Sequence, residues 1–197
     1  MSCFRTLFVL LLLLGAQLAG AATLLVANKS AASLSLFDAD TLAPMATLPT
    51  GEGPHEVAVS PDGRRALVTN YGTREQAGAS LTLVDIAAAK VLATIALAGA
   101  SRPHGVEWLD DGRAVVTAEG IRALLLVDVD AGIVTSTIAV DQEVAHMVAL
   151  AADGGRAFVA NIGSGTASVV DLKAGRKIRD LTSGDGTEGI AIARQGA

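Results

Sequence analysis

The segment Gly53–Arg65, GPHEVAVSPDGRR, recurs three more times along the chain, and this repetition constrains the fold more than any other feature. The later copies begin at Arg102, Val144 and Gly186. In each copy a glycine follows a polar residue by eight positions, and the polar residues are His55, His104, His146 and Glu188. The chain has only three histidines, so each of them occupies the same position of the repeat. These four side chains are therefore predicted to lie at equivalent places.

The pattern within one repeat predicts four antiparallel strands. Short β-branched and alternating runs are separated by Gly, Asp and Pro turns, without a helical pattern long enough to compete. In the first complete repeat the strands are expected at 55–60, at 66–70, in a run that ends at Asp85, and at 91–97. The repeat length of 42 to 49 residues is typical of a four-stranded propeller blade. An aspartate closes the third strand of each repeat, where it can bond amides of the next turn: Asp38, Asp85, Asp128 and Asp171.

The repeats add up to four blade equivalents, at 23–49 plus 188–193, 55–97, 104–140 and 146–182. Residues 23–49 supply the second, third and fourth strands of one blade, and 188–193 supply a first strand. A propeller can close by pairing the two ends of its chain in such a split blade. We expect an all-β fold over 22–197, a β-propeller of four-stranded antiparallel blades. The four blades form either a closed four-bladed ring or part of a larger one.

Residues 1–21 are typical of a secretory signal peptide. Arg5 is their only charge, 7–14 are apolar, and Ala19–Ala21 fit a cleavage site of small residues. The apolar run is too short to span a bilayer. The cleavage point carries no cysteine, so we do not expect a lipid anchor. We expect a periplasmic or secreted protein without membrane insertion after cleavage. The single cysteine, Cys3, lies in this segment, so the mature chain can form no disulfide and no thiolate metal site.

The repeat resembles the YVTN-type β-propeller repeat of YncE-like exported bacterial proteins. The resemblance is carried by GPHEVAVSPDGRRALVTNYG, by SLTLVDIAAAKVLATIAL and by FVANIGSGTASVVDLKAGRKI, and it covers the whole mature chain. It implies a propeller, which in this family usually has seven blades, whereas this sequence has four repeats. Family members are mostly described as binding or scaffold proteins, and some accompany redox cofactor systems. The resemblance therefore implies no single activity.

The polar repeat positions are predicted to meet at one mouth of the channel. The first strand of each blade lines the channel, and the second strand runs back to the same mouth. The residues expected there are His55, His104, His146 and Glu188, with Asn28, Asn70, Glu119 and Asn161 at or beside the ends of the second strands. The asparagines either cap backbone groups or contact a ligand, and Glu119 is the most interesting single carboxylate.

Three imidazoles and a carboxylate suit zinc or another divalent metal ion. Blades about 10 Å apart would place the inner strands of a four-bladed ring about 7 Å from the axis, close enough for His55, His104, His146 and Glu188 to share one ion. In a seven-bladed ring the radius of about 11 to 12 Å is too large. Alternatively, each histidine packs at the mouth and hydrogen-bonds a neighbouring backbone.

Three other features are placed by the pattern. Strand alternation predicts that Glu56 points away from the channel. Trp108 is expected to pack in the core and not to serve as a stacking platform for a ligand. Five extra residues in YGTREQAGAS place Arg74 and Glu75 either at the rim of the binding mouth or in a tolerated surface loop.

Three functions remain open. We favour a binding or scaffold protein that presents a His/Glu-lined mouth to a small ligand, a cofactor or a protein partner. The second is a metal-dependent, lactonase-like hydrolase in which Glu119 is the base and the three histidines and Glu188 bind the metal. The third is a structural half-propeller completed by another chain, which implies self-association. The formal net charge of −5 makes nucleic acid a poor partner. A divalent metal is the only cofactor that the residues suggest.

Overall fold

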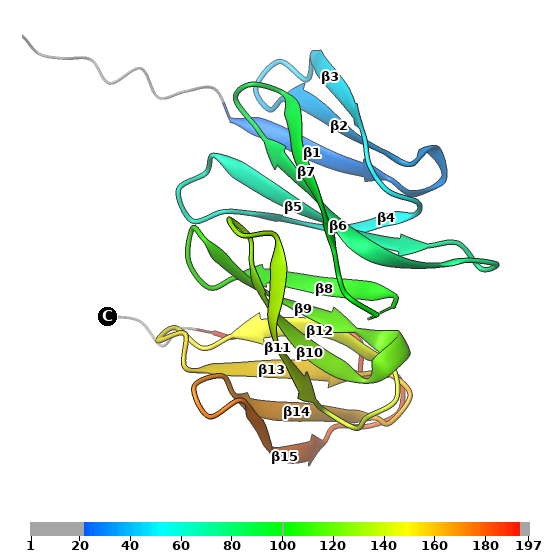
Figure 1. Cartoon of the computed structure of the whole chain (residues 1–197), viewed down its shortest axis with the longest axis vertical. Coiled ribbons are helices and arrows are strands. Elements are labelled where there is room, and N and C mark those ends of the chain that lie inside the picture. Colours follow the sequence, from blue (N-terminus) through cyan, green and yellow to red (C-terminus); the bar gives the residue numbers. More distant parts are fainter. Residues whose placement is uncertain (1–21, 100, 194–197) are drawn as a thin grey trace, which may run out of the picture.

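The computed structural model describes residues 22–99 and 101–193. Its regular elements are strands, apart from two short 3₁₀ turns, η1 (Lys29–Ala31) and η2 (Glu119–Ile121). The strands form four antiparallel sheets, which lie one after another along the long axis of the molecule (Figure 1). The prediction of an all-β, propeller-type fold is confirmed. The predicted signal peptide at 1–21 lies outside the described residues.

Within each sheet the strands pair in the order of the sequence. The first sheet contains β1 (Thr23–Asn28), β2 (Ser33–Asp38) and β3 (Pro44–Pro49); the second contains β4 (Pro54–Val59), β5 (Arg65–Gly72), β6 (Ala77–Asp85) and β7 (Lys90–Ala96). The third contains β8 (Pro103–Trp108), β9 (Arg113–Ala118), β10 (Ala123–Asp128) and β11 (Ile133–Ala139); the fourth contains β12 (Ala145–Leu150), β13 (Arg156–Asn161), β14 (Thr166–Asp171) and β15 (Arg176–Thr182). Each sheet thus corresponds to one predicted blade.

The first sheet has three strands, and the expected fourth strand does not join it. Residues 188–193 are not in a strand. Ile190–Ile192 instead line a hollow with residues from the ends of β8 and β12, whereas β1 lies at the opposite end of the row of sheets (Figure 1). A closed four-bladed ring is therefore not formed within the described residues. The two ends that were expected to pair are separated by the intervening sheets.

The turns after the third strands follow the predicted design. The carboxylates of Asp38, Asp85, Asp128 and Asp171 each accept a hydrogen bond from the backbone N–H three residues further on, at 2.7 or 2.8 Å. The predicted structural role of these aspartates is confirmed.

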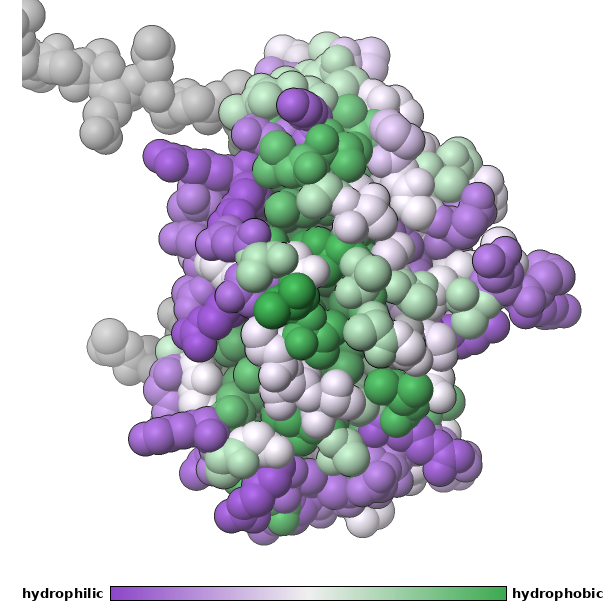
Figure 2. Space-filling model, viewed as in Figure 1, coloured by the Kyte–Doolittle hydropathy of each residue, from purple (hydrophilic) through white to green (hydrophobic). Residues whose placement is uncertain are grey.

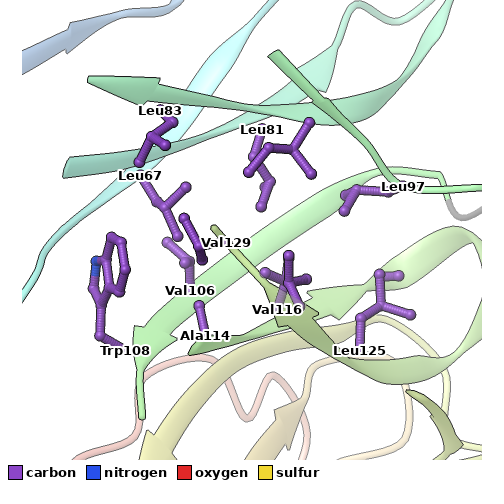
Figure 3. Close-up of a cluster of buried hydrophobic side chains, with 13 residues drawn as sticks. Leu67, Leu81, Leu83, Leu97, Val106, Trp108, Ala114, Val116, Leu125 and Val129 are labelled. Carbon is purple, nitrogen blue, oxygen red and sulfur yellow. The ribbon is translucent and has the colours of Figure 1, made fainter. Parts of the chain in front are cut away.

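The core is divided into clusters that lie between neighbouring sheets. Figure 3 shows the central cluster, in which Leu67 and Leu81 of the second sheet pack against Val116 and Leu125 of the third. Trp108 is 7% exposed and belongs to this cluster, as predicted. Its Nε1–H donates to the carbonyl of Ala58 at 3.0 Å and so ties β8 to β4. Because burial of one such side chain contributes about 1.5 to 3 kcal/mol, sheet packing can hold the blades without disulfides.

Polar side chains gather at the ends of the strands. Figure 2 shows apolar side chains in a band along the long axis of the face in view, with hydrophilic side chains to both sides.

No helix within 22–99 or 101–193 is long and apolar enough to cross a membrane.

Candidate binding site at the histidine mouth

The three histidines lie side by side, although they belong to three different sheets. They stand near the beginnings of β4, β8 and β12. The ring centroids of His55 and His104 are 4.0 Å apart, and those of His104 and His146 are 3.6 Å apart. We call these residues the histidine row. The repeat predicted that they would meet, but the contact does not need a closed ring, because each imidazole touches the one from the adjacent sheet.

A β-bulge in each first strand sets the direction of the histidine side chain. In β4, His55 and Glu56 together lie opposite Thr69 of β5. The same shift occurs at the start of β8 and of β12. Thr69 and Thr117 stabilise the first two bulges, since their hydroxyls accept the N–H of Glu56 at 3.0 Å and of Gly105 at 2.8 Å. Bulges commonly redirect side chains at functional sites.

The bulge also explains why the prediction for Glu56 was wrong. Strict alternation would turn this side chain away from His55, but its Oε1 lies 3.3 Å from His55 Nδ1. The hydrogen bond from His55 holds the pKa of the Glu56 carboxyl below its ordinary value, although burial acts in the opposite direction. Glu56 is therefore a member of the site.

The loop before each histidine is hydrogen-bonded to the end of the second strand of the same sheet. The residue two positions before each histidine has a left-handed backbone, with φ of 59°, 54° and 56° at Gly53, Arg102 and Val144. Their carbonyls each accept, at 3.1 Å, an N–H from an equivalent residue at or just after the end of the second strand: Tyr71, Glu119 and Ile162. These bonds bring Tyr71 and Glu119 to the histidine row. A left-handed conformation is strained for Arg102 and especially for β-branched Val144.

Gly105 allows β8 and β12 to approach closely. A Cβ at this position would lie 2.8 Å from the carbonyl oxygen of His146 and 2.9 Å from the backbone nitrogen of Val148. The Thr117 hydroxyl donates to the same His146 oxygen at 2.5 Å. The close approach at Gly105 and the Thr117 hydrogen bond together hold the His104 and His146 rings against each other.

Glu119 is the carboxylate most deeply placed in the site. Its Oε1 lies 2.7 Å from His146 Nδ1, and its Oε2 accepts the Tyr71 hydroxyl at 2.6 Å. The side chain is 8% exposed. Burial alone would raise the pKa of Glu119, but the hydrogen bonds from His146 and Tyr71 outweigh it and lower the pKa. Both oxygens are engaged, so a role as general base would require one of these bonds to break.

Burial raises the pKa of Tyr71, and its bond to Glu119 adds to this effect, so the hydroxyl stays a donor. Tyr71 was not predicted from the sequence. The available signal was its position directly after Asn70, which matches the position of Glu119 after β9.

His104, at the centre of the row, is almost completely buried. It is 3% exposed, and its Nδ1 has no hydrogen-bond partner in the part of the chain that the structure describes. Burial, with a smaller effect of the neighbouring imidazoles of His146 and His55, lowers the pKa of His104 to about 4. The ring is therefore neutral at pH 7. A buried polar atom without a partner is costly, by about 1 to 3 kcal/mol, so it points to a missing ligand.

Glu188 lies at the edge of the row. Its Oε1 is 3.6 Å from His146 Nε2, and its side chain is 70% exposed. Within the described ranges, two groups have ligand atoms within 4.8 Å of one another: His55, Glu56 and His104, and His104, Glu119 and His146. The predicted single set of three histidines with Glu188 is not one of them. Glu119 and Glu56 supply the carboxylates of these two groups.

The asparagines at the ends of the second strands bond within their own sheets. The side-chain amides of Asn28, Asn70 and Asn161 donate to hydroxyls of the third strands, on Ser33 and Ser35, on Ser80 and Thr82, and on Thr166 and Ser168. In the third sheet Ala118 replaces the asparagine, and Ala123 and Leu125 replace the hydroxyl residues. Asn70 and Asn161 are at most 1% exposed. These contacts give the asparagines a structural role within their sheets, although the acceptors of these bonds are side-chain hydroxyls and not the predicted backbone groups, and the predicted ligand contact remains a prediction.

Cationic side chains surround Tyr71 at the rim. Lys29 Nζ and the Arg102 guanidinium each lie 5.1 Å from the centre of its ring. Arg102 also donates to the carbonyl of Thr73 at the start of the β5–β6 hairpin, whose exposed tip carries Arg74 and Glu75. The inserted residues therefore extend the same mouth.

Comparison with known proteins agrees with this architecture. The sequence matches the family described as "YNCE-like beta-propeller" over residues 15–114. The structure is similar to hydrazine synthase of Kuenenia stuttgartiensis, with a TM-score of 0.71, 24% identity, and coverage of 82% of this chain and 46% of that chain. It is also similar to a functionally unknown protein from Desulfotomaculum acetoxidans DSM 771, with a TM-score of 0.68, 13% identity, and coverage of 82% and 53%.

At these identities the likeness concerns the fold alone. The chain spans about half the length of the two solved structures. No curated protein matches the sequence.

Proposed function

Because the chain belongs to the YNCE-like β-propeller family, we propose that it is a binding protein that holds a small anionic molecule at the histidine mouth. One observation carries the proposal: three sheets bring three imidazoles and two carboxylates together, and the central His104 has a buried nitrogen that finds no hydrogen-bond partner within 22–99 or 101–193. Convergent polar groups with unmet hydrogen-bonding capacity are what a small-molecule site requires.

The charges at the rim support an anionic ligand. Lys29 and Arg102 each lie 5.1 Å from the centre of the Tyr71 ring at the entrance. They can attract an anion, and the deeper imidazoles can donate hydrogen bonds to it. The carboxylates of Glu56 and Glu119 are already bonded to His55 and His146, which limits their repulsion of a ligand.

A ligand panel tests this function. Small dicarboxylates, sugar phosphates and lactones would be added to the protein, with and without Zn²⁺, while the Hε1 signals of the three histidines are followed by NMR. A ligand should shift the signals of the row and bind much more weakly to a His104→Phe variant, which keeps a ring but loses both nitrogens. The matched control is Glu107→Gln, at the other end of β8. The proposal fails if no compound shifts these signals, or if the hits bind equally well to His104→Phe. The lactones also report hydrolysis through product formation.

A second candidate function is a half-propeller completed by another chain. β1 pairs with β2 on one side, and no strand in 22–99 or 101–193 pairs with its other edge. Leu24 and Val26 of this strand are 44% and 37% exposed. An unpaired strand edge with apolar side chains is a template for pairing with a further strand. A monomeric mass in light scattering would exclude this function, and a dimer that dissociates in a Val26→Lys variant would support it.

We further propose that the protein is exported. The support is the sequence pattern of 1–21, with one charge, an apolar run and small residues at 19–21. The mass of the mature protein should correspond to a chain that starts at Ala22. A mass that includes Met1, measured on protein from the periplasm or medium, would contradict cleavage at this point.

A further inference from the structure

We propose that His104, His146 and Glu119 form a binding site for one divalent first-row transition-metal ion, with zinc as the reference metal. This inference rests on the proposed binding function and names its anchor, since three protein ligands leave a coordination position open for the anionic molecule. It differs from the set predicted from the sequence, because it assigns Glu119 to the metal and leaves Glu188 outside the ligand set.

The donor atoms are of the right kind and are held together before any ion binds. His104, His146 and Glu119 each offer one atom, and these atoms lie within 4.8 Å of one another. Two imidazole nitrogens and one carboxylate oxygen are ordinary ligands of zinc and its neighbours in the first transition row. Zinc sites with three protein ligands keep the fourth position for water or substrate. The trio comes from two adjacent sheets that Gly105 and Thr117 hold in close contact.

Burial gives an independent reason to expect a bound group. The side chains of Glu119 and His146 are 8% and 13% exposed, and His104 is 3% exposed. The Nδ1 atom of His104 has no partner within the described chain. A metal would satisfy a nitrogen of this ring, whereas packing alone leaves it without a bond.

The position of the carboxylates also favours a cation. Glu119 Oε1 lies 2.7 Å from His146 Nδ1, and Glu56 Oε1 lies 3.3 Å from His55 Nδ1. Two carboxylates therefore face the imidazoles at the place where a divalent ion would bind.

Outer partners can orient two of the ligands. Tyr71 donates to Glu119 Oε2 at 2.6 Å, which leaves Oε1 for the metal. Oε1 faces His146 Nδ1 at 2.7 Å, and this hydrogen bond would give way if both atoms bound an ion. If Nδ1 ligates, the proton of His146 moves to Nε2, where the Glu188 carboxylate lies 3.6 Å away. A slightly closer approach of the exposed Glu188 side chain would let it accept this proton and fix the tautomer, as carboxylates do in many histidine metal sites.

The other group, His55, Glu56 and His104, is the competing location. We favour the Glu119 trio because Glu56 is more exposed than Glu119, at 35% against 8%, and His55 is more exposed than His146, at 29% against 13%. In addition, Tyr71 already donates a hydrogen bond to Glu119, and the Glu188 carboxylate lies 3.6 Å from His146 Nε2. Both groups use His104, so variants of the other residues are needed to tell them apart.

The experiment is a titration of chelator-treated protein with Zn²⁺ by calorimetry, together with the visible spectrum of Co²⁺ as a report on coordination. Wild-type protein should bind one ion. Glu119→Gln and His146→Phe should each weaken binding by more than about 100-fold, and Glu188→Gln by about 10-fold, the smaller effect of an outer partner. Glu143→Gln is the matched control for Glu119→Gln. Its carboxylate pairs with Arg122 and is 61% exposed, so binding should not change.

The outcomes separate this inference from the proposed function. Absence of stoichiometric Zn²⁺ binding by folded wild-type protein overturns the metal site, and an anion that still shifts the histidine signals without metal leaves the binding function intact. Binding that survives Glu119→Gln and His146→Phe but is lost in His55→Phe also overturns it, by placing the ion in the other group. Circular dichroism of every variant shows whether a loss of binding reflects unfolding.

Discussion

Protonation of His104 should destabilise the protein in mildly acidic solution. His104 is buried at the centre of the histidine row, and burial lowers its pKa from 6.5 to about 4. The folded state therefore resists the proton that the unfolded chain accepts readily. The unfolded state binds more protons between these two pH values. The free energy of unfolding is therefore unaffected by His104 well above pH 6.5 and falls as the pH decreases towards 4.

The size of the effect follows from the same two values. The gap between 6.5 and about 4 corresponds to about 3 kcal/mol, and about 2 kcal/mol of it should be lost by pH 5. The titratable groups that face the ring are His55, His146, Glu56 and Glu119. The lowered pKa values of the two glutamates make them lose stabilising interactions at still lower pH. The interval from pH 6.5 to 5 is therefore the one that reports on His104.

The assay is urea unfolding, followed by circular dichroism at several pH values in the presence of a chelator. The comparison variant is His104→Phe, which keeps a ring between His55 and His146 but cannot be protonated. We expect the free energy of unfolding of wild-type protein to fall by about 2 kcal/mol more than that of His104→Phe between pH 6.5 and 5. At pH 7 the variant should be at least as stable, because the buried nitrogen without a partner is removed. Equal declines in both proteins, within about 0.5 kcal/mol, would refute the reasoning.

Three further substitutions test the structure around the site. Gly105→Ala places a methyl group 2.8 Å from the His146 carbonyl oxygen, so unfolding in urea should show a loss of about 1 to 3 kcal/mol; an unchanged midpoint would contradict the close approach. Val144→Gly relieves a left-handed backbone with φ of 56°, and it should raise the free energy of unfolding by about 1 kcal/mol, whereas a decrease would argue against strain there. Asn161→Ala removes bonds to the buried Ser168 hydroxyl and the half-buried Thr166 hydroxyl and should cost about 1 to 3 kcal/mol, a loss that a ligand-contacting asparagine at an open mouth would not show.

The repeat was sufficient to predict the blades, because alternation and turn residues act locally. The predicted strands of the first complete repeat differ from the observed ones by one or two residues at their ends. The aspartates at the ends of the third strands were predicted correctly for the same reason, since each bonds an amide three residues away. Ring closure depends on how far apart distant ends lie, and a local pattern carries no such information. For that reason the prediction that 188–193 pair with β1 was wrong.

The site was predicted only in part. The common repeat position of His55, His104 and His146 identified the row, because equivalent residues of adjacent blades face the same mouth. Strand alternation failed for Glu56, since the bulge that turns it towards His55 leaves no pattern of polar and apolar residues. The partners of Glu119 depend on contacts between sheets, which sequence spacing does not contain.

Nuclear Overhauser effects between the histidine rings provide the most direct test of the account. The central claim is that neighbouring blades stack their imidazoles at one mouth, with ring centroids 4.0 and 3.6 Å apart in the pairs His55–His104 and His104–His146. Protein labelled at histidine should show strong effects between the Hε1 or Hδ2 protons of both pairs, and these should disappear for a pair when one member is replaced by alanine. Assigned histidine signals without any contact between rings would contradict the claim.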